Sequence, residues 1–340
     1  MLIIIFILFC TARANPYKQF LTRQLIHTKI SAYAASTISN LRTQWKAYLN
    51  FCHLATLRPY PTSPFILSLF AQHLSYSLKS PQSVQNYLSG VRSAIIMVGG
   101  DPPPLSHPQI KLTIRGLKRT MSHQIKRALP MDPDILIQIH SLLSFHSNFQ
   151  SVFWAYCILA FLLMSRKSNL VPDSNAAFDH RKHLTWSDIS ISQHAVVVTL
   201  KWAKNNQFGE RQVQIPLLSN PGSPLCPVNA VLCLTTFIPP SPHKSIFRYS
   251  TGSKVKILTY PLVMSTLKSV MFALGRDPTL YSSHSFRRGG ATYGHLIGLS
   301  EHDIQVMGDW ASDAYKVYLH GTVQSKVKSA KMFRDSLVHK

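Results

Sequence analysis

The stretch HSFRRGGATYGHLIGLSEHDIQVMGDWASDAYKVYLH, residues 284–320, concentrates polar and aromatic side chains near the end of a 340-residue chain. It holds four His, two Arg, one Trp and three Tyr, in a protein with only 13 Asp and Glu against 36 Lys and Arg. One serine just before it and two inside it predict short helices that begin after Ser283, Ser300 and Ser312, because serine caps helix N-termini. Imidazole, guanidinium and aromatic groups are thus concentrated in this region.

The charge of the whole chain points to a polyanionic partner. The formal net charge is +23, and the first acidic residue is Asp101. Such an excess repels itself in a compact protein unless a polyanion neutralises it. An anionic membrane surface fits the charge equally well, but the basic residues are spread through apolar-periodic segments and do not form a tail or one amphipathic helix. We therefore expect duplex DNA as the partner, and no membrane.

The N-terminal segment MLIIIFILFCTARANP disagrees with an intracellular DNA-binding protein. Its apolar run and Ala-Arg-Ala resemble a secretory signal with its cleavage site, but it lacks a charged start and is too short to span a bilayer. The five cysteines are odd in number and widely spaced, which fits a reducing compartment and neither a disulfide framework nor zinc. We treat residues 1–30 as an extension of uncertain role, and expect a nuclear or otherwise intracellular protein without cofactor.

Residues 31–125 predict a helical domain that binds DNA. Serine followed by proline at Ser63 and Ser80 is the pattern of an N-cap before the first helical position. A further helix over 107–120 carries basic residues three or four positions apart along one flank. A solvated bundle that happens to be basic is the alternative. The basic residues expected to contact DNA in and after this helix are Lys111, Arg115, Lys118, Arg119, Lys126 and Arg127.

The first helix of this domain is expected over 36–52 from its apolar periodicity. The residues that share its apolar face are Ile38, Leu41, Trp45, Tyr48, Leu49 and Cys52.

Residues 127–335 predict a second, mostly helical domain with one small antiparallel sheet. Two apolar helices are expected over 133–143 and 150–164, and two more over 227–237 and 259–275. Between these pairs, short strands are expected at 183–191, 195–204 and 210–218, the last two flanking the turn signal NNQFG. The fold class is therefore mainly α.

The scarcity of acids excludes most metal-dependent nucleases, which need two or three carboxylates around Mg²⁺. No P-loop, HExxH, GxSxG or GxGxxG motif occurs. Without a metal, fixed cations must neutralise a phosphodiester: guanidinium groups match its oxygens in pairs, and imidazole can bind them or take a proton near neutral pH. A tyrosine phenol, with a reference pKa of about 10, becomes a nucleophile when neighbouring cations stabilise its phenolate.

HSFRRGG followed by MGDWASDAYKVYL resembles the C-terminal signature of the tyrosine recombinases of the phage-integrase type, and most closely those of eukaryotic mobile elements such as Cryptons and tyrosine-recombinase retrotransposons. The resemblance covers about residues 30–335. It implies a SAM-like core-binding domain over 31–125 and a catalytic domain over 127–335. It also implies DNA cleavage and rejoining through a 3′-phosphotyrosyl intermediate, without metal or ATP, by a homotetramer on two DNA sites.

Carried onto this sequence, the signature makes His284 and Arg287 its His-x-x-Arg pair, Trp310 its second His or Trp, and Tyr318 its nucleophile. The spacing from Trp310 to Tyr318 is one residue shorter than in many bacterial members, so Tyr315 stays open as the nucleophile. Arg288 follows Arg287 directly and is expected to point elsewhere, toward DNA backbone or solvent.

Two more family residues lie upstream. The first Arg of the family follows an apolar helix, as Arg166 does, and the family's general-acid lysine lies on a β-hairpin, where Lys204 fits best and Lys201 second. Where the family often has an acid, this chain has Asn169. That departure leaves open a catalytically inactive or domesticated DNA-binding protein derived from a mobile element. A type IB topoisomerase would need a larger clamp, and a secreted basic protein would need the N-terminal signal to function.

Overall fold

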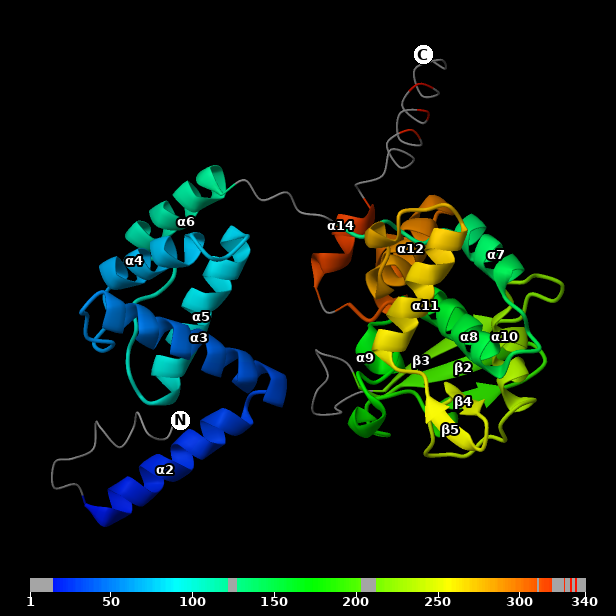
Figure 1. Ribbon diagram of the computed structural model, residues 1–340, viewed down its shortest axis with the longest axis horizontal. Helices are drawn as coiled ribbons and strands as arrows, with labels where there is room; N and C mark the ends of the chain where they lie inside the picture. The colour runs from blue at the N-terminus through cyan, green and yellow to red at the C-terminus, as the bar shows by residue number, and fades with distance from the viewer. Residues whose placement is uncertain are drawn as a thin grey trace. The chain divides into compact units, whose positions relative to one another are not determined.

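The computed structural model describes residues 15–121, 127–202, 212–310 and 312–319, together with Val327, Lys331 and Arg334. The chain divides into two compact units, Met1–Ile125 and Lys126–Lys340. In Figure 1 the first unit runs from blue to blue-green and the second from green to red. Each unit has its own apolar core, so each is described by itself.

Unit 1 is helical throughout its described part. Ser63 and Ser80 cap two of its helices by accepting hydrogen bonds from the N–H groups of Ile66 and Ser83, which confirms both Ser-Pro starts. The third predicted start, before Pro108, is also a helix start, with His107 as the cap. The helices are α2 (Pro16–Ser31), α3 (Ala35–Leu54), α4 (Pro64–Ser75), α5 (Pro81–Met97) and α6 (Pro108–Thr120).

The apolar face of α3 builds much of the unit 1 core. Five of the six residues predicted for this face are buried, and Leu49 is only half-buried. Phe51, which was not predicted, is buried instead and stacks against Phe70 of α4, with ring centroids 5.3 Å apart. Tyr48 lies at the centre and donates its hydroxyl to Thr62 (2.9 Å).

Unit 2 combines helices with two small antiparallel sheets. Its helices are α7 (Pro133–Leu142), α8 (Asn148–Leu162), α9 (Lys167–Leu170), α10 (Pro227–Thr235), α11 (Tyr260–Ala273), α12 (Ser283–Leu296), α13 (Glu301–Met307) and α14 (Lys316–Leu319). Short 3₁₀ turns are η1 (Asn175–Ala177), η2 (Trp186–Asp188), η3 (Pro278–Leu280) and η4 (Asp313–Tyr315). The mainly helical fold with a small antiparallel sheet is thus confirmed.

The three predicted strands form one sheet in the order β1-β2-β3, with bounds Ile189–Ile191, Ala195–Leu200 and Val213–Leu218. In the β2–β3 ladder Val198 pairs with Ile215. β1 is shorter than predicted because Trp186–Asp188 forms η2. The expectation of a single sheet is wrong, since β4 (Arg248–Thr251) and β5 (Lys254–Ile257) form a second, two-stranded sheet.

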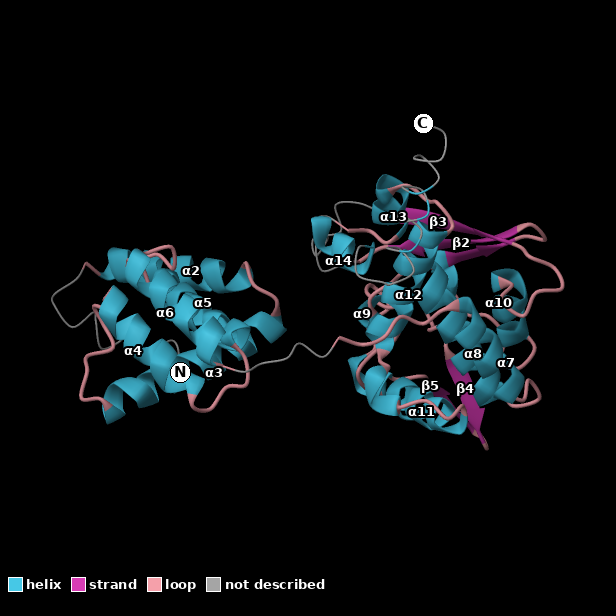
Figure 2. Cartoon of the chain, turned by 90° about the horizontal axis from the view of Figure 1, so that it is seen from above, coloured by secondary structure: helices cyan, strands magenta, loops and turns pink. Residues whose placement is uncertain are grey.

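Helix α8 is the centre of unit 2, and α10, α12 and β4 pack against it (Figure 2). Almost every residue of α8 is buried. α12 approaches the chain very closely at two glycines: a Cβ on Gly289 would lie 1.8 Å from the carbonyl oxygen of Met131, and one on Gly290 would lie 2.3 Å from that of Phe161. Gly290 therefore allows α12 to pack closely on α8, and Gly289 allows its close approach to the segment before α7.

Two further findings concern membrane-spanning helices and the state of the cysteines. Among the described helices, none has the length and apolar character needed to cross a membrane. The described cysteines are free thiols, of which Cys52, Cys157 and Cys226 are buried and Cys233 is half-buried.

Candidate active site

The N-terminal turn of α12 carries the His-x-x-Arg pair. Ser282 caps this helix and accepts a hydrogen bond from the N–H of His284 (3.2 Å). Because residues three apart share a helical face, His284 and Arg287 project to the same side. The side chain of His284 is exposed, whereas Arg287 is only 4% exposed. One helical turn thus presents an accessible imidazole and a buried guanidinium together.

Arg287 is held by backbone carbonyls and an aromatic ring. Its Nη1 donates to the carbonyl oxygens of Met164 and Gly308, the latter at 3.0 Å. The guanidinium carbon lies 3.7 Å from the ring centre of Trp310, a cation–π stack. Its Nη2 is buried and has no hydrogen-bond partner among the described residues. Trp310, which the sequence predicts for the site, therefore stacks on Arg287, and Nη2 of the guanidinium keeps an unused donor among the described residues.

Burial and neighbouring cations shift the acid–base properties of this turn. Burial, and then the charge of Arg166, lowers the pKa of Arg287 to about 9, while Tyr318 and Asp309 act in the opposite direction. Arg287 therefore stays positively charged at neutral pH. Desolvation by surrounding protein atoms, and then the charges of Arg287, Arg166 and Lys167, lower the pKa of His284. The imidazole is accordingly neutral at pH 7 when no anion is bound.

Arg166 reaches the same place from the end of α8. It is the N-cap of the short helix α9, has an extended backbone conformation and is half-buried. Met164, two residues earlier, has a φ of 46° and supplies the carbonyl that binds Arg287. A left-handed conformation at a non-glycine residue is strained and is typical of positions under functional constraint. The structure brings Arg166, His284 and Arg287 within electrostatic range of one another.

The two candidate nucleophiles differ in accessibility. Tyr315 is 3% exposed and packs in a small apolar cluster, its ring centroid 5.8 Å from that of Trp310. Tyr318 is half-buried, 6.2 Å from Trp310 by the same measure, and its carbonyl accepts a hydrogen bond from Thr292 (3.0 Å). Tyr318 also affects the pKa of both Arg287 and Arg288. Tyr318 is thus the tyrosine that combines access with nearby cations.

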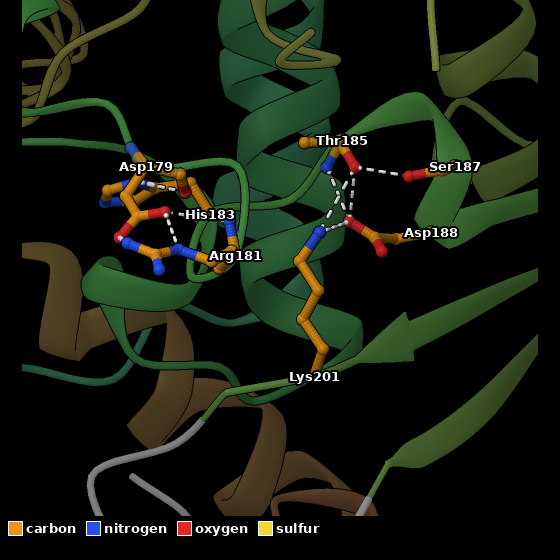
Figure 3. Close-up of polar contacts among 7 residues, drawn as sticks. All are labelled: Asp179, Arg181, His183, Thr185, Ser187, Asp188 and Lys201. Carbon is orange, nitrogen blue, oxygen red and sulfur yellow. Dashed lines mark hydrogen bonds and ion pairs between the residues drawn. The ribbon is translucent and has the colours of Figure 1, made fainter. Parts of the chain in front are cut away.

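The predicted general acid Lys204 lies outside the described residues. The second candidate, Lys201, directly follows β2 and forms an ion pair with Asp188, with Nζ 2.5 Å from Oδ2 (Figure 3). Sequence reasoning did not single out Asp188. A signal was present, because Thr185 and Asp188 form a capping box around η2, and Thr-x-x-Asp is a sequence sign of such a box.

Asn169, the residue at the position where the family often has an acid, is buried. Its N–H donates to the carbonyl of Arg166 (3.0 Å), and its own carbonyl accepts from the N–H of Leu184 (2.9 Å). Its side-chain Oδ1 has no hydrogen-bond partner within the described chain. The backbone of Asn169 therefore connects the Arg166 turn to the segment that leads into η2.

The basic residues predicted to contact DNA lie in two places. Lys111, Arg115 and Lys118 line a groove of about 250 Å³ along α6 and α5 in unit 1, and Arg119 is exposed nearby on α6. In unit 2, Arg127 is exposed. Lys126 lies outside the described residues.

Arg288 has an intramolecular partner. Its Nη1 donates to the carbonyl of Ala128 (2.6 Å), and burial, then the charge of Arg127, lowers its pKa. The guanidinium thus points away from Arg287, toward the start of unit 2.

Comparison with known proteins gives the fold. The sequence matches no family model and no curated protein. Its structure is similar to the Tn1549 transposon integrase in complex with circular intermediate DNA (TM-score 0.55, 11% identity, 91% of this chain and 98% of that one). It is also similar to a lambda integrase dimer bound to a COC′ core site (0.52, 14%, 92% and 82%). A third match is the XerH site-specific recombinase bound to palindromic difH substrate (0.55, 13%, 81% and 73%). The chain has the fold of the tyrosine recombinases and integrases.

Proposed function

We propose that this protein breaks and rejoins DNA strands as a tyrosine recombinase, with Tyr318 as its nucleophile. The observation that carries the proposal is the buried Arg287 beside Tyr318. Its Nη2 lacks a partner among the described residues, and the charges of Arg166 and Tyr318 both shift its pKa. A guanidinium with an unused donor edge is suited to a phosphate oxygen, which would complete its hydrogen bonding.

The reaction follows from these groups. The phenol oxygen of Tyr318 forms a bond to the scissile phosphorus, and the bond from phosphorus to the 5′-oxygen breaks. Neutral His284 takes the phenol proton, and the ammonium of Lys204 gives a proton to the leaving 5′-oxygen. Arg166 and Arg287 stabilise the charge on the non-bridging oxygens. Attack by a 5′-hydroxyl on the 3′-phosphotyrosyl bond reverses the steps, so rejoining needs neither ATP nor a metal.

The partner and assembly are part of the same proposal. Duplex DNA fits the net charge of +23 and the basic groove on α6. We propose a homotetramer on two DNA sites, acting in the nucleus or another compartment that holds DNA, and an origin in a eukaryotic mobile element.

A covalent-adduct assay tests the proposal. A pool of duplexes with a randomised core is nicked in one strand, so that cleavage near the nick releases a short 5′-hydroxyl fragment and traps the protein on DNA. We expect wild-type protein to form an SDS-resistant adduct in the presence of EDTA. Trypsin separates the two tyrosines, because Lys316 lies between them. The nucleotide-bearing peptide should therefore be residues 317–326, which contain Tyr318 alone.

Substitution of each tyrosine completes the test. Tyr318→Phe should form no adduct, whereas Tyr315→Phe should still form one, since the buried ring of Tyr315 packs against Trp310. Adduct on the peptide that ends at Lys316 would reassign the nucleophile to Tyr315. Tight DNA binding by wild-type protein without any adduct would favour the inactive, domesticated DNA-binding protein instead.

A further inference from the structure

A buried polar cluster lies where strand β2 ends (Figure 3). Oδ2 of Asp188 accepts three hydrogen bonds: from the N–H of Thr185 (2.8 Å), from the hydroxyl of Thr185 (2.7 Å) and from Nζ of Lys201 (2.5 Å). Lys201 also donates to the Thr185 hydroxyl (3.2 Å), which lies 2.9 Å from the hydroxyl of Ser187. The ammonium of Lys201 is thus bound by two oxygens of one turn.

Apart from the exposed Ser187, the cluster is largely shielded from water. The side chains of Asp188 and Lys201 are 8% and 20% exposed, and Thr185 is fully buried. Removing two charges from water costs free energy that their attraction barely offsets, so a buried ion pair is a poor means of adding stability. Such a pair instead holds two segments in one arrangement, because removing either partner leaves the other charge buried and unpaired. This ion pair fixes the end of β2 to η2.

The same cluster is tied to the active-site turn. Leu184, next to Thr185, donates its N–H to the carbonyl of Asn169, and Asn169 donates its N–H to the carbonyl of Arg166. Asn169, Asp188 and Lys201 also line one narrow crevice. A continuous set of hydrogen bonds therefore connects the Arg166 turn to the end of β2. Lys204 follows Lys201 by three residues, which span at most about 11 Å of chain.

We propose that Lys201 is a positioning residue: paired with Asp188, it anchors the end of β2 to the Arg166 turn, and this anchoring is required for the proton transfer that the proposed function assigns to Lys204. The assignment rests on the proposed function, in which the ammonium of Lys204 gives its proton to that oxygen. Lys201 itself is engaged by Asp188 and Thr185, so it serves to place the acid and does not act as the acid.

Two substrates separate positioning from general folding. One duplex, chosen from the pool that forms adduct, has the ordinary 5′-oxygen, and its twin has sulfur at the bridging 5′ position. A thiol has a pKa of about 8.5, so its thiolate leaves without receiving a proton. Loss of a general acid costs about 10²- to 10⁴-fold on oxygen, and misplacing one by about 1 Å costs up to about 10²-fold. On the sulfur substrate, the same change should slow cleavage very little.

The variants are Lys201→Met, Lys201→Arg and Lys204→Met, with Lys182→Met as a matched control. Lys182 lines the same crevice, but it is exposed and does not bond to Asp188. We expect Lys204→Met to cleave the oxygen substrate about 10²- to 10⁴-fold more slowly, and Lys201→Met about 10- to 100-fold more slowly. Both should cleave the sulfur substrate within about twofold of wild type. Lys201→Arg, which keeps the pair with Asp188, should cleave both substrates within about threefold. Lys182→Met should match wild type.

Each of the other outcomes would overturn the positioning role or the proposed function. Equal loss of Lys201→Met on both substrates, or no loss on either, overturns the positioning role. If Lys201→Arg is as slow on oxygen as Lys201→Met and sulfur rescues both, Lys201 is itself the acid and the assignment is wrong. If wild-type protein forms no adduct with either substrate, the proposed function fails, and the positioning role falls with it.

Discussion

Arg287 carries its charge in a buried place, where a protein rarely leaves an arginine. Two carbonyls and the Trp310 ring hold it, and burial together with Arg166 lowers its pKa to about 9. Keeping a desolvated cation beside another cation costs free energy in the DNA-free protein. A phosphate bound between Arg166 and Arg287 would offset that cost, so the two neighbouring cations favour binding of the reacting group.

Replacing Arg287 should therefore affect the chemical step far more than DNA binding. Arg287→Gln is expected to slow adduct formation by about 10²- to 10³-fold, the usual cost of one lost donor to a developing oxyanion. Arg287→Lys should be nearly as slow, because an ammonium cannot bind two oxygens side by side. Single-turnover adduct formation at saturating protein measures this. Arg276→Gln is the control: Arg276 bonds to Gln138 at the end of α11 and should leave the rate unchanged.

A substantial loss of affinity with an unchanged rate at saturation would contradict this role, since Arg287 would then only bind DNA. The same experiment has a structural check. Gln at 287 leaves the carbonyls of Met164 and Gly308 without their donor, so thermal unfolding of each variant must be measured alongside its rate.

At the scale of elements, α12 matters because it carries His284 and Arg287 and approaches α8 as closely as backbone can. Gly290 makes this possible, since a Cβ there would overlap the carbonyl oxygen of Phe161 in α8, and Gly289 likewise allows close approach to the carbonyl of Met131 before α7. The approach also sets the distance between Arg287 and the Met164 carbonyl. The geometry of the site therefore requires small residues at positions 289 and 290.

Gly290→Ala should destabilise unit 2 by about 1–3 kcal/mol, the usual cost of overpacking, because the backbone of Phe161 cannot easily move away. Gly116→Ala on α6 is the matched control. A Cβ there has nothing within 4 Å, so alanine should stabilise unit 1 by about 0.5–1 kcal/mol through its better helix propensity. Urea unfolding followed by circular dichroism measures both. An unchanged midpoint for Gly290→Ala would show that α12 can shift without cost.

The helices and strands also show which features can be predicted from residues close together in the sequence. Ser-Pro starts identified α4 and α5, since a cap and a proline act within one turn of helix. The β4–β5 hairpin was missed because Lys254 and Lys256, both exposed, give it no buried alternating face to detect. β1 was predicted too long because the Thr185–Asp188 capping box turns the chain into η2.

For the whole molecule, the net charge of +23 is the property that most affects the expected binding to DNA. DNA binding should weaken steeply with salt, because each neutralised phosphate releases counterions. The groove on α6 is expected to account for a defined part of this slope. Lys111, Arg115 and Lys118 line it, and each phosphate contact contributes about 0.9 to the slope of log K against log salt.

The triple variant Lys111→Gln, Arg115→Gln, Lys118→Gln should therefore reduce that slope by about 2–3. Anisotropy titrations of a labelled duplex between about 50 and 200 mM salt measure it. A triple variant of the exposed residues Lys254, Lys256 and Lys268 in unit 2 removes the same charge elsewhere and should change the slope by less than about 1. Equal losses in both would mean that bulk charge, and not the groove, binds DNA.

Sequence alone determined the chemistry that was available: a basic chain poor in acids, helices that start at Ser-Pro and Ser caps, and a His-x-x-Arg spacing that puts His284 and Arg287 on one face. These follow from composition and from contacts within a turn or two of helix. Only the tertiary structure decided that Met164, 123 residues earlier, binds Arg287, and that Tyr315 is buried while Tyr318 is accessible. It also decided that Lys201 pairs with Asp188. These outcomes depend on which distant segments pack together, and burial and pairing across such distances leave no periodic mark on the sequence.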